Sequence, residues 1–184
     1  MSGIAAPELL TSRLRLREHR ADDLDASAAM WGDADVVRFI GGKPFSRSDV
    51  WARLLRYAGM WRLLGYGFWV VEDRTTGAFL GEVGFMDAKR DIDPAIVDPE
   101  AGWAFARHAH GCGFASEALA AAFDWADREI AAPCIACMIE DGNDVSRAVA
   151  AKFEFHSYAR TTFSGSPVEL FRRARILERK FAKA

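Results

Sequence analysis

One segment near the middle of the chain restricts the fold more than any other. An apolar stretch over residues 100–107 leads into the turn Gly111-Cys112-Gly113, and apolar residues at helical spacing follow over 114–128. A second apolar stretch, residues 134–139, comes next. Two strands joined through one helix form a parallel pair with a right-handed crossover. The chain is therefore expected to contain a β-α-β unit.

The segments on either side of this unit predict antiparallel pairing. Residues 13–17 alternate between arginine and leucine, which is typical of a strand with one apolar face. Short polar links favour hairpins, and the chain offers two of them. Their strands span 68–71 with 79–85, and 155–162 with 168–173; further helices are predicted over 24–31, from Ser46 to about 64, and over 143–152. We therefore predict an α/β fold with a mixed, mostly antiparallel central sheet and helices on both faces.

Composition excludes several classes of protein. A chain of 184 residues with 51% hydrophobic and 27% charged residues fits a single globular domain over 1–184, with tails expected at 1–9 and 176–184. A net charge of −2 argues against a nucleic-acid partner. No apolar run approaches the roughly 18 residues of a membrane span, so no membrane partner is expected. Three cysteines give no disulfide framework, which favours a cytoplasmic setting.

The Gly111-Cys112-Gly113 turn is the strongest candidate for a binding site. Glycines two residues apart let the backbone turn tightly and approach a ligand, and the next helix points its free N–H groups at the turn. Such a site suits a phosphate or pyrophosphate. The turn differs from a P-loop, which needs Lys-Ser/Thr after the last glycine, and from the Rossmann motif, whose third glycine is Ser116 here. A plain structural turn is the alternative.

Several motifs in a fixed order sharpen this interpretation. Over residues 10–175 the chain resembles the GCN5-related N-acetyltransferases (GNAT), and especially the branch that includes the bacterial ribosomal-protein N-terminal acetyltransferases. The matching motifs, in addition to the first strand from Leu10 to Arg17, are Glu100-x-Gly102-Trp103, Gly111-x-Gly113-Phe114-Ala115-Ser116-Glu117-Ala118-Leu119, Asn143-x-x-Ser146 and Lys152-Phe153-Glu154-Phe155. Two positions depart from the family pattern: His108 replaces Gln or Arg, and Glu154 replaces a helix-ending Gly.

The resemblance implies acetyl-CoA as co-substrate and no metal. The amides around the turn would hold the pyrophosphate, the pantetheine arm would lie like a strand beside 103–107, and a backbone N–H near Phe105 or Ala106 would polarise the thioester. Arg107 would offset the change at His108. The implied CoA-binding residues are Phe105, Ala106, Arg107, His110, Gly111, Cys112, Gly113, Phe114, Ala115 and Asn143.

The implied reaction is direct attack of a primary amine on the thioester in a ternary complex. Many relatives protonate the leaving thiolate with a Tyr whose position is Ala150 here, so Ser146 is the candidate acid; a helix-capping serine is the alternative. Glu100 and Glu82 are the candidate bases. Burial among apolar neighbours would raise the pKa of Glu82, although this side chain could instead face solvent or pair with an arginine. A water chain is a third route.

Identity of the acceptor is left open by the sequence. A protein N-terminus or a small-molecule amine would fit, and the segments 32–44 and 88–99 would select it; a homodimer is also left open. One rival function is a non-catalytic acyl-CoA sensor. Another is a metal or redox protein using Cys134, Cys137, His108 and His110, although strand residues three apart point to opposite faces.

Overall fold

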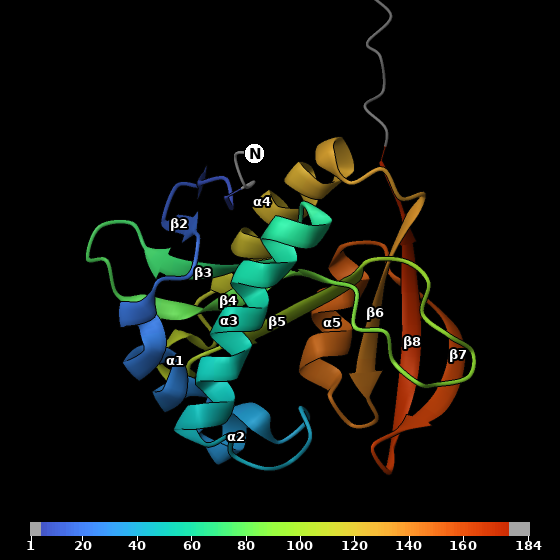
Figure 1. Ribbon diagram of the computed structural model, residues 1–184. Coiled ribbons are helices and arrows are strands. Elements are labelled where there is room, and N and C mark those ends of the chain that lie inside the picture. The colour runs from blue at the N-terminus through green and yellow to red at the C-terminus, as the bar shows by residue number, and fades with distance from the viewer. Residues whose placement is uncertain (1–4, 177–184) are drawn as a thin grey trace, which may run out of the picture.

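The computed structural model describes residues 5–176 and contains an eight-stranded sheet with the order β1-β2-β3-β4-β5-β6-β8-β7 (Figure 1). Every neighbouring pair is antiparallel except β5 with β6. The predicted parallel pair, both hairpins and the mixed sheet are confirmed. The strands are β1 (Leu9–Leu10), β2 (Leu14–Arg17), β3 (Phe68–Asp73), β4 (Phe79–Met86), β5 (Glu100–Phe105), β6 (Cys134–Glu140), β7 (His156–Phe163) and β8 (Ser166–Ala174).

Helices cover both faces of the sheet, as predicted. Neighbouring strand residues point to opposite faces, and in β3 Trp69 packs with α4 while Phe68 stacks on Tyr57 of α3 at 4.4 Å between ring centroids. The helices α1, α2 and α3 share one face, and α4 with α5 covers the other. Their bounds are α1 (Leu24–Trp31), α2 (Ala34–Val37), α3 (Arg47–Leu64), α4 (Phe114–Glu129) and α5 (Asp144–Lys152).

The larger core lies between the sheet and α4. Tryptophans 61, 69 and 125 meet there edge to face, with centroid separations of 4.7 to 5.4 Å. The indole N–H groups of Trp61 and Trp69 donate to backbone carbonyls, so their burial leaves these polar groups satisfied. No helix in residues 5–176 is long and apolar enough to cross a bilayer.

Two boundaries differ from the sequence prediction. The strand expected over 100–107 ends at Phe105, although Ala106 N still donates to Leu80 O of β4 at 2.9 Å. Residues Arg107–Ala109 form a 3-10 turn instead. The N-terminal tail is shorter than expected, since Leu9 pairs with Leu16 in the sheet. Most of the tail predicted at 176–184 lies outside the described residues.

The end of α5 confirms the conformational demand at Glu154. This residue adopts φ = 59°, the left-handed region that usually favours glycine. Glu154 N donates to Ala151 O at 3.3 Å and Phe155 N donates to Ala150 O at 3.2 Å. This pair of bonds is a Schellman ending, so a non-glycine residue sits where the helix terminus needs a left-handed turn.

Candidate functional site

The pairing between β5 and β6 is limited to one position. Glu100 is the only β5 residue in register with β6, opposite Ala136, and Ala136 N donates to Pro99 O at 2.9 Å. Figure 1 shows the two strands separating beyond this point. The edge of β5 from Ala101 to Phe105 therefore lacks a partner strand, and an extended ligand can add to such an edge through main-chain hydrogen bonds.

The predicted glycine turn follows β5 after the short 3-10 turn Arg107–Ala109. Gly111 and Gly113 have φ angles of 74° and 77°, and α4 begins at Phe114. No side chain caps this helix, so its first N–H groups and the positive end of its dipole face the turn. This geometry suits an anion, as expected from the sequence. Ring nitrogen Nε2 of His110 lies 2.8 Å from Phe105 O, which joins the turn to the strand end.

The turn is also held from the N-terminal strand, a link that the sequence analysis did not assign. Glu117 in the first turn of α4 accepts from Thr11 Oγ1 at 2.6 Å and from Arg13 Nε at 2.7 Å. Arg13 also donates to Cys112 O at 3.1 Å. Partial burial opposes ionisation of Glu117, but hydrogen bonds from Thr11, Arg13 and Ser12 outweigh it and lower its pKa to about 2.

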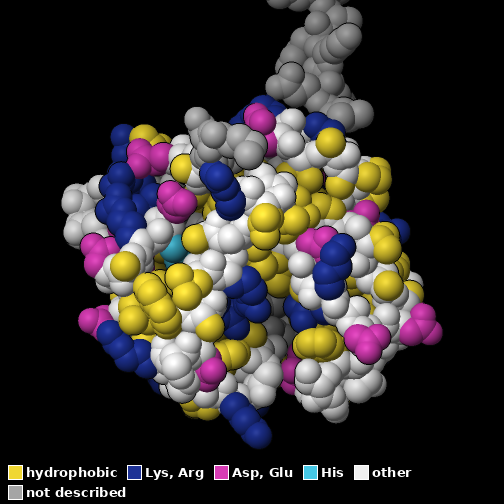
Figure 2. Space-filling view, viewed as in Figure 1, with side chains coloured by type: hydrophobic (Ala, Val, Ile, Leu, Met, Phe, Trp, Pro, Cys, Tyr) yellow, Lys and Arg dark blue, Asp and Glu magenta, His cyan; other side chains and the backbone are white. Residues whose placement is uncertain are grey.

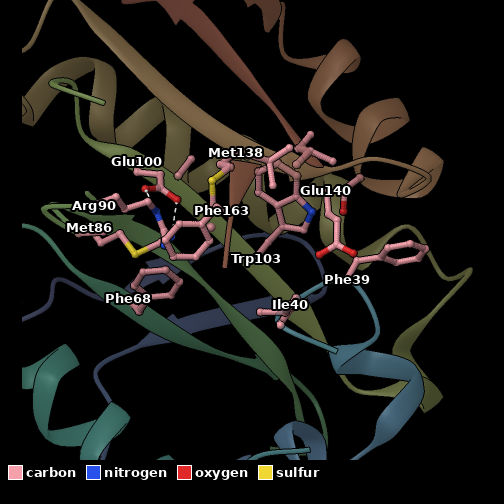
Figure 3. A pocket seen from close by; sticks show the side chains of 18 of the residues that line it. Phe39, Ile40, Phe68, Met86, Arg90, Glu100, Trp103, Met138, Glu140 and Phe163 are labelled. Atoms are coloured by element: carbon pink, nitrogen blue, oxygen red, sulfur yellow. Dashed lines mark hydrogen bonds and ion pairs between the residues drawn. The ribbon is translucent and has the colours of Figure 1, made fainter. Parts of the chain in front are cut away.

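A cavity of about 480 Å³ opens on the α3 side of the separated strands. Its floor includes residues 102–104 of β5 and 138–140 of β6, so the cavity reaches the gap between the two strands. Figure 3 shows apolar side chains around it and the carboxylates of Glu100 and Glu140 within it. The labelled apolar side chains are Phe39, Ile40, Phe68, Met86, Trp103, Met138 and Phe163.

Ser146 lines this cavity from α5. The helix cap is Asn143, whose Oδ1 accepts from Ser146 N at 3.1 Å. The Ser146 hydroxyl has no hydrogen-bond partner within residues 5–176. The capping alternative for Ser146 is therefore wrong, because Asn143 performs that role, and the half-buried hydroxyl is free to face a ligand.

Glu82 is fully buried and does not line the cavity. Its oxygens accept from Ser27 Oγ at 2.6 Å and from Trp31 Nε1 at 3.0 Å, and His19 Nε2 lies 3.5 Å away. Burial raises the pKa of Glu82, but His19, Ser27 and Trp31 more than compensate and the net shift is downward. The expectation of a raised pKa is wrong, because these three neighbours favour the carboxylate.

Glu100, a candidate base, lines the cavity, and its carboxylate is paired with an arginine there. Both of its oxygens receive hydrogen bonds of 2.8 Å from Arg90, whose guanidinium lies over the Phe163 ring (Figure 3). Glu140, at the end of β6, also lines the cavity and has no ion-pair partner among the residues described. The sequence analysis missed Glu140, because its position at a strand end near Asn143 gave no separate signal.

Other predicted residues have partners of their own. Arg107 pairs with Asp35 of α2, and His108 Nε2 lies 3.1 Å from Phe79 O. Cys134 and Cys137 are free thiols on β6, the first half-buried and the second buried. Over the described range 5–176 no group of three or more His, Cys, Asp or Glu side chains is placed to hold a metal ion. The rings of His108 and His110 each lie within hydrogen-bond distance of a backbone carbonyl oxygen.

Comparison with known proteins agrees with this geometry. The family model described as an acetyltransferase (GNAT) domain matches residues 13–156. The chain is 32% identical over 162 residues to the uncharacterized protein YkkB of Bacillus subtilis (strain 168), covering 85% of this chain and 89% of YkkB.

Solved structures share the fold. A putative GnaT-family acetyltransferase from Bordetella pertussis superimposes with a TM-score of 0.81 and 29% identity, covering 92% of this chain and 100% of that one. RimL, a ribosomal L7/L12 alpha-N-protein acetyltransferase solved in complex with coenzyme A, gives a TM-score of 0.73 at 14% identity, covering 91% of this chain and 98% of RimL. The second similarity is one of fold alone.

Proposed function

The chain belongs to the GNAT acetyltransferase family, and on that premise we propose that it transfers the acetyl group of acetyl-CoA to a primary amine by direct attack. The observation that carries the proposal is the gap between β5 and β6. It runs from the glycine turn at one end to the cavity with Ser146 at the other. A cytoplasmic setting, where acetyl-CoA is available, fits the three free cysteines.

Residues of the gap are suited to the parts of acetyl-CoA. The turn has left-handed glycines, and its second glycine directly precedes the uncapped end of α4, which favours a pyrophosphate. Lys152 Nζ lies 3.3 Å from Ser116 Oγ at the same helix end and adds a positive charge. The unpaired edge of β5 would accept the pantetheine amides as a neighbouring strand accepts them. Acetyl-CoA supplies the thioester, and the chain positions it.

Proton transfer at the amine and at the thiol falls to residues that line the cavity. Ser146 would donate to the leaving thiolate, because its hydroxyl is free of protein partners in the described part of the chain. Glu100 and Glu140 are the carboxylates placed to take a proton from the ammonium, directly or through water. Glu100 is engaged in an ion pair and Glu140 is not, so we propose Glu140 as the main base that takes the proton from the ammonium group.

An amine panel with acetyl-CoA, read by thiol release, tests the proposal. Binding without turnover of any amine would leave a CoA sensor instead. Gly113→Asp should abolish CoA binding in calorimetry, since it places a side chain and a negative charge at the turn. Gly77→Asp is the matched control, because Gly77 also has a positive φ of 73° but lies in the exposed β3–β4 turn. Equal affinities in the two variants would contradict the site.

Ser146→Ala separates the acid from a merely structural serine. We expect kcat to fall by about 10²-fold or more with little change in the acetyl-CoA KM, since protonation matters in the transition state. A fall of less than about threefold would assign thiolate protonation to water.

A further inference from the structure

Two arginines of α3 face the cavity without a carboxylate partner. Arg53 and Arg56 lie three residues apart, so they share one face of the helix, and both line the cavity. Arg53 donates to the Tyr57 hydroxyl at 3.1 Å and its guanidinium lies 4.0 Å from the Trp31 ring centroid. Neither arginine forms an ion pair within the described residues 5–176.

Arg90, Arg17 and Arg173, which are half-buried or buried, are neutralised by carboxylates, whereas Arg53 is half-buried and Arg56 is exposed. Arg90 in the same cavity pairs with Glu100, Arg17 pairs with Asp23, and Arg173 pairs with Asp127. Partial desolvation lowers the pKa of Arg56, and the charges of Arg53 and Arg90 lower it further. Both guanidinium groups therefore have donors available to a ligand that supplies the opposite charge.

Carboxylates and unpaired arginines therefore line the cavity from different elements of the fold. Glu140 lines the cavity from the end of β6 and Ser146 lines it from α5, Glu100 lies across from Glu140 with its partner Arg90 (Figure 3), and Arg53 and Arg56 line the cavity from α3. Figure 2 shows a hollow on this face with Lys and Arg side chains at its border. A ligand with a cationic amine at one end and an anionic group at the other would match both groups of side chains.

We propose that the acceptor is a primary amine that also carries an anionic group, a carboxylate or a phosphate, which Arg53 and Arg56 bind while the amine faces Ser146. This inference rests on the proposed acetyltransferase function. Guanidinium groups hold carboxylate and phosphate oxygens through charge-assisted hydrogen bonds, often in pairs. A polyamine acceptor would place further positive charge against the two arginines.

Matched acceptors measure the preference. Peptide amides with an N-terminal alanine followed by glutamate, glutamine or lysine differ mainly in one charge, and phosphoethanolamine with ethanolamine forms a second pair. In the presence of acetyl-CoA we expect kcat/KM to be at least about tenfold higher for the anionic member of the pair that fits. The lysine peptide and spermidine should be the poorest acceptors. A larger kcat/KM ratio for the glutamate and glutamine peptides indicates that the arginines bind a carboxylate. A larger ratio for phosphoethanolamine and ethanolamine indicates that they bind a phosphate.

Variants of α3 show whether the arginines cause this preference. Arg56→Gln should remove most of the ratio between the kcat/KM values for the glutamate and glutamine peptides. Arg53→Gln should act similarly, and if loss of its contacts with Trp31 prevents folding, Arg56→Gln alone carries the test. Arg62→Gln is the control, since Arg62 is exposed on the same helix and does not line the cavity.

The outcomes separate this inference from the proposed function. Acetylation of neutral and anionic amines at equal rates would overturn the inference and leave the acetyltransferase in place. If CoA binds and no amine is acetylated, calorimetry of the same peptides on the CoA-bound protein still decides: tighter binding of the glutamate peptide, lost in Arg56→Gln, supports the anion site. Equal affinities for the glutamate and glutamine peptides overturn it.

Discussion

Replacing Glu117 by Gln tests how the glycine turn is held. The carboxylate accepts from Thr11, Ser12 and both the backbone and side chain of Arg13, and its pKa falls from 4.5 to about 2. At 1.36 kcal/mol per pKa unit that shift corresponds to about 3 kcal/mol. The Glu117 side chain is 18% exposed and its Arg13 partner is 48% exposed, so solvent screening reduces the expected loss to about 1–2 kcal/mol.

Chemical denaturation at several pH values measures this loss. A folded-state pKa below the unfolded value means that the stabilisation is fully present above about pH 4.5 and is lost as pH falls toward 2. The free energy of unfolding of Glu117→Gln should therefore lie below that of the parent by a constant amount from pH 8 to 5. The gap between the two proteins should shrink below about pH 4.5.

Glu129→Gln is the matched control, because Glu129 is an exposed residue at the other end of the same helix and has no ion-pair partner among the described residues. It should leave stability nearly unchanged. A Glu117→Gln variant as stable as the parent at pH 7, or a stability gap that persists unchanged to pH 3, would refute the argument. The variant should also bind CoA more weakly, because Arg13 loses its anchor and no longer holds Cys112 O.

Three further outcomes are expected. Glu154→Gly should raise the free energy of unfolding by about 0.5–1 kcal/mol, and thermal melts should show no such gain for Glu154→Ala, which keeps the strained φ of 59°. Glu82→Gln should destabilise the fold by about 1–3 kcal/mol, since the glutamine amide cannot accept hydrogen bonds from both Ser27 and Trp31. A changed pH–rate profile of this variant would instead identify Glu82 as a base. Glu140→Gln should remove the plateau of kcat/KM at high pH, and Glu100→Gln, measured alongside it, shows which carboxylate sets that plateau.

Most of the fold could be predicted from local sequence patterns. The alternation over residues 13–17, the apolar spacing of α3 and the glycines of the turn each specify a local structure, and the crossover rule then sets the parallel pair. The helix predicted to start at Ser46 does so, and Ser46 forms a capping box with Asp49. The end of β5 was misjudged, because the 3-10 turn Arg107–Ala109 that follows the strand leaves no pattern in the alternation of apolar residues.

The site was predictable only where its chemistry is local. The turn residues and Ser146 follow from short motifs, whereas the partners of Glu82 lie more than fifty residues away in the chain. Nothing in the spacing of Arg53 and Arg56 says which face of α3 meets the cavity, since that depends on how α1 and the sheet pack against it. Tertiary contacts therefore decide which carboxylates and guanidinium groups are free.

Strands β5 and β6 are paired at a single residue pair, which leaves the sheet as two blocks, β1–β5 and β6–β8. The crossover helix α4 connects the two blocks. An extended ligand along β5 would act as an additional strand at this seam. Its binding free energy would then add to the cooperativity of folding as well as to affinity. Amide exchange in the two blocks would slow together when the ligand is bound, so the substrate would complete the architecture of the enzyme that uses it.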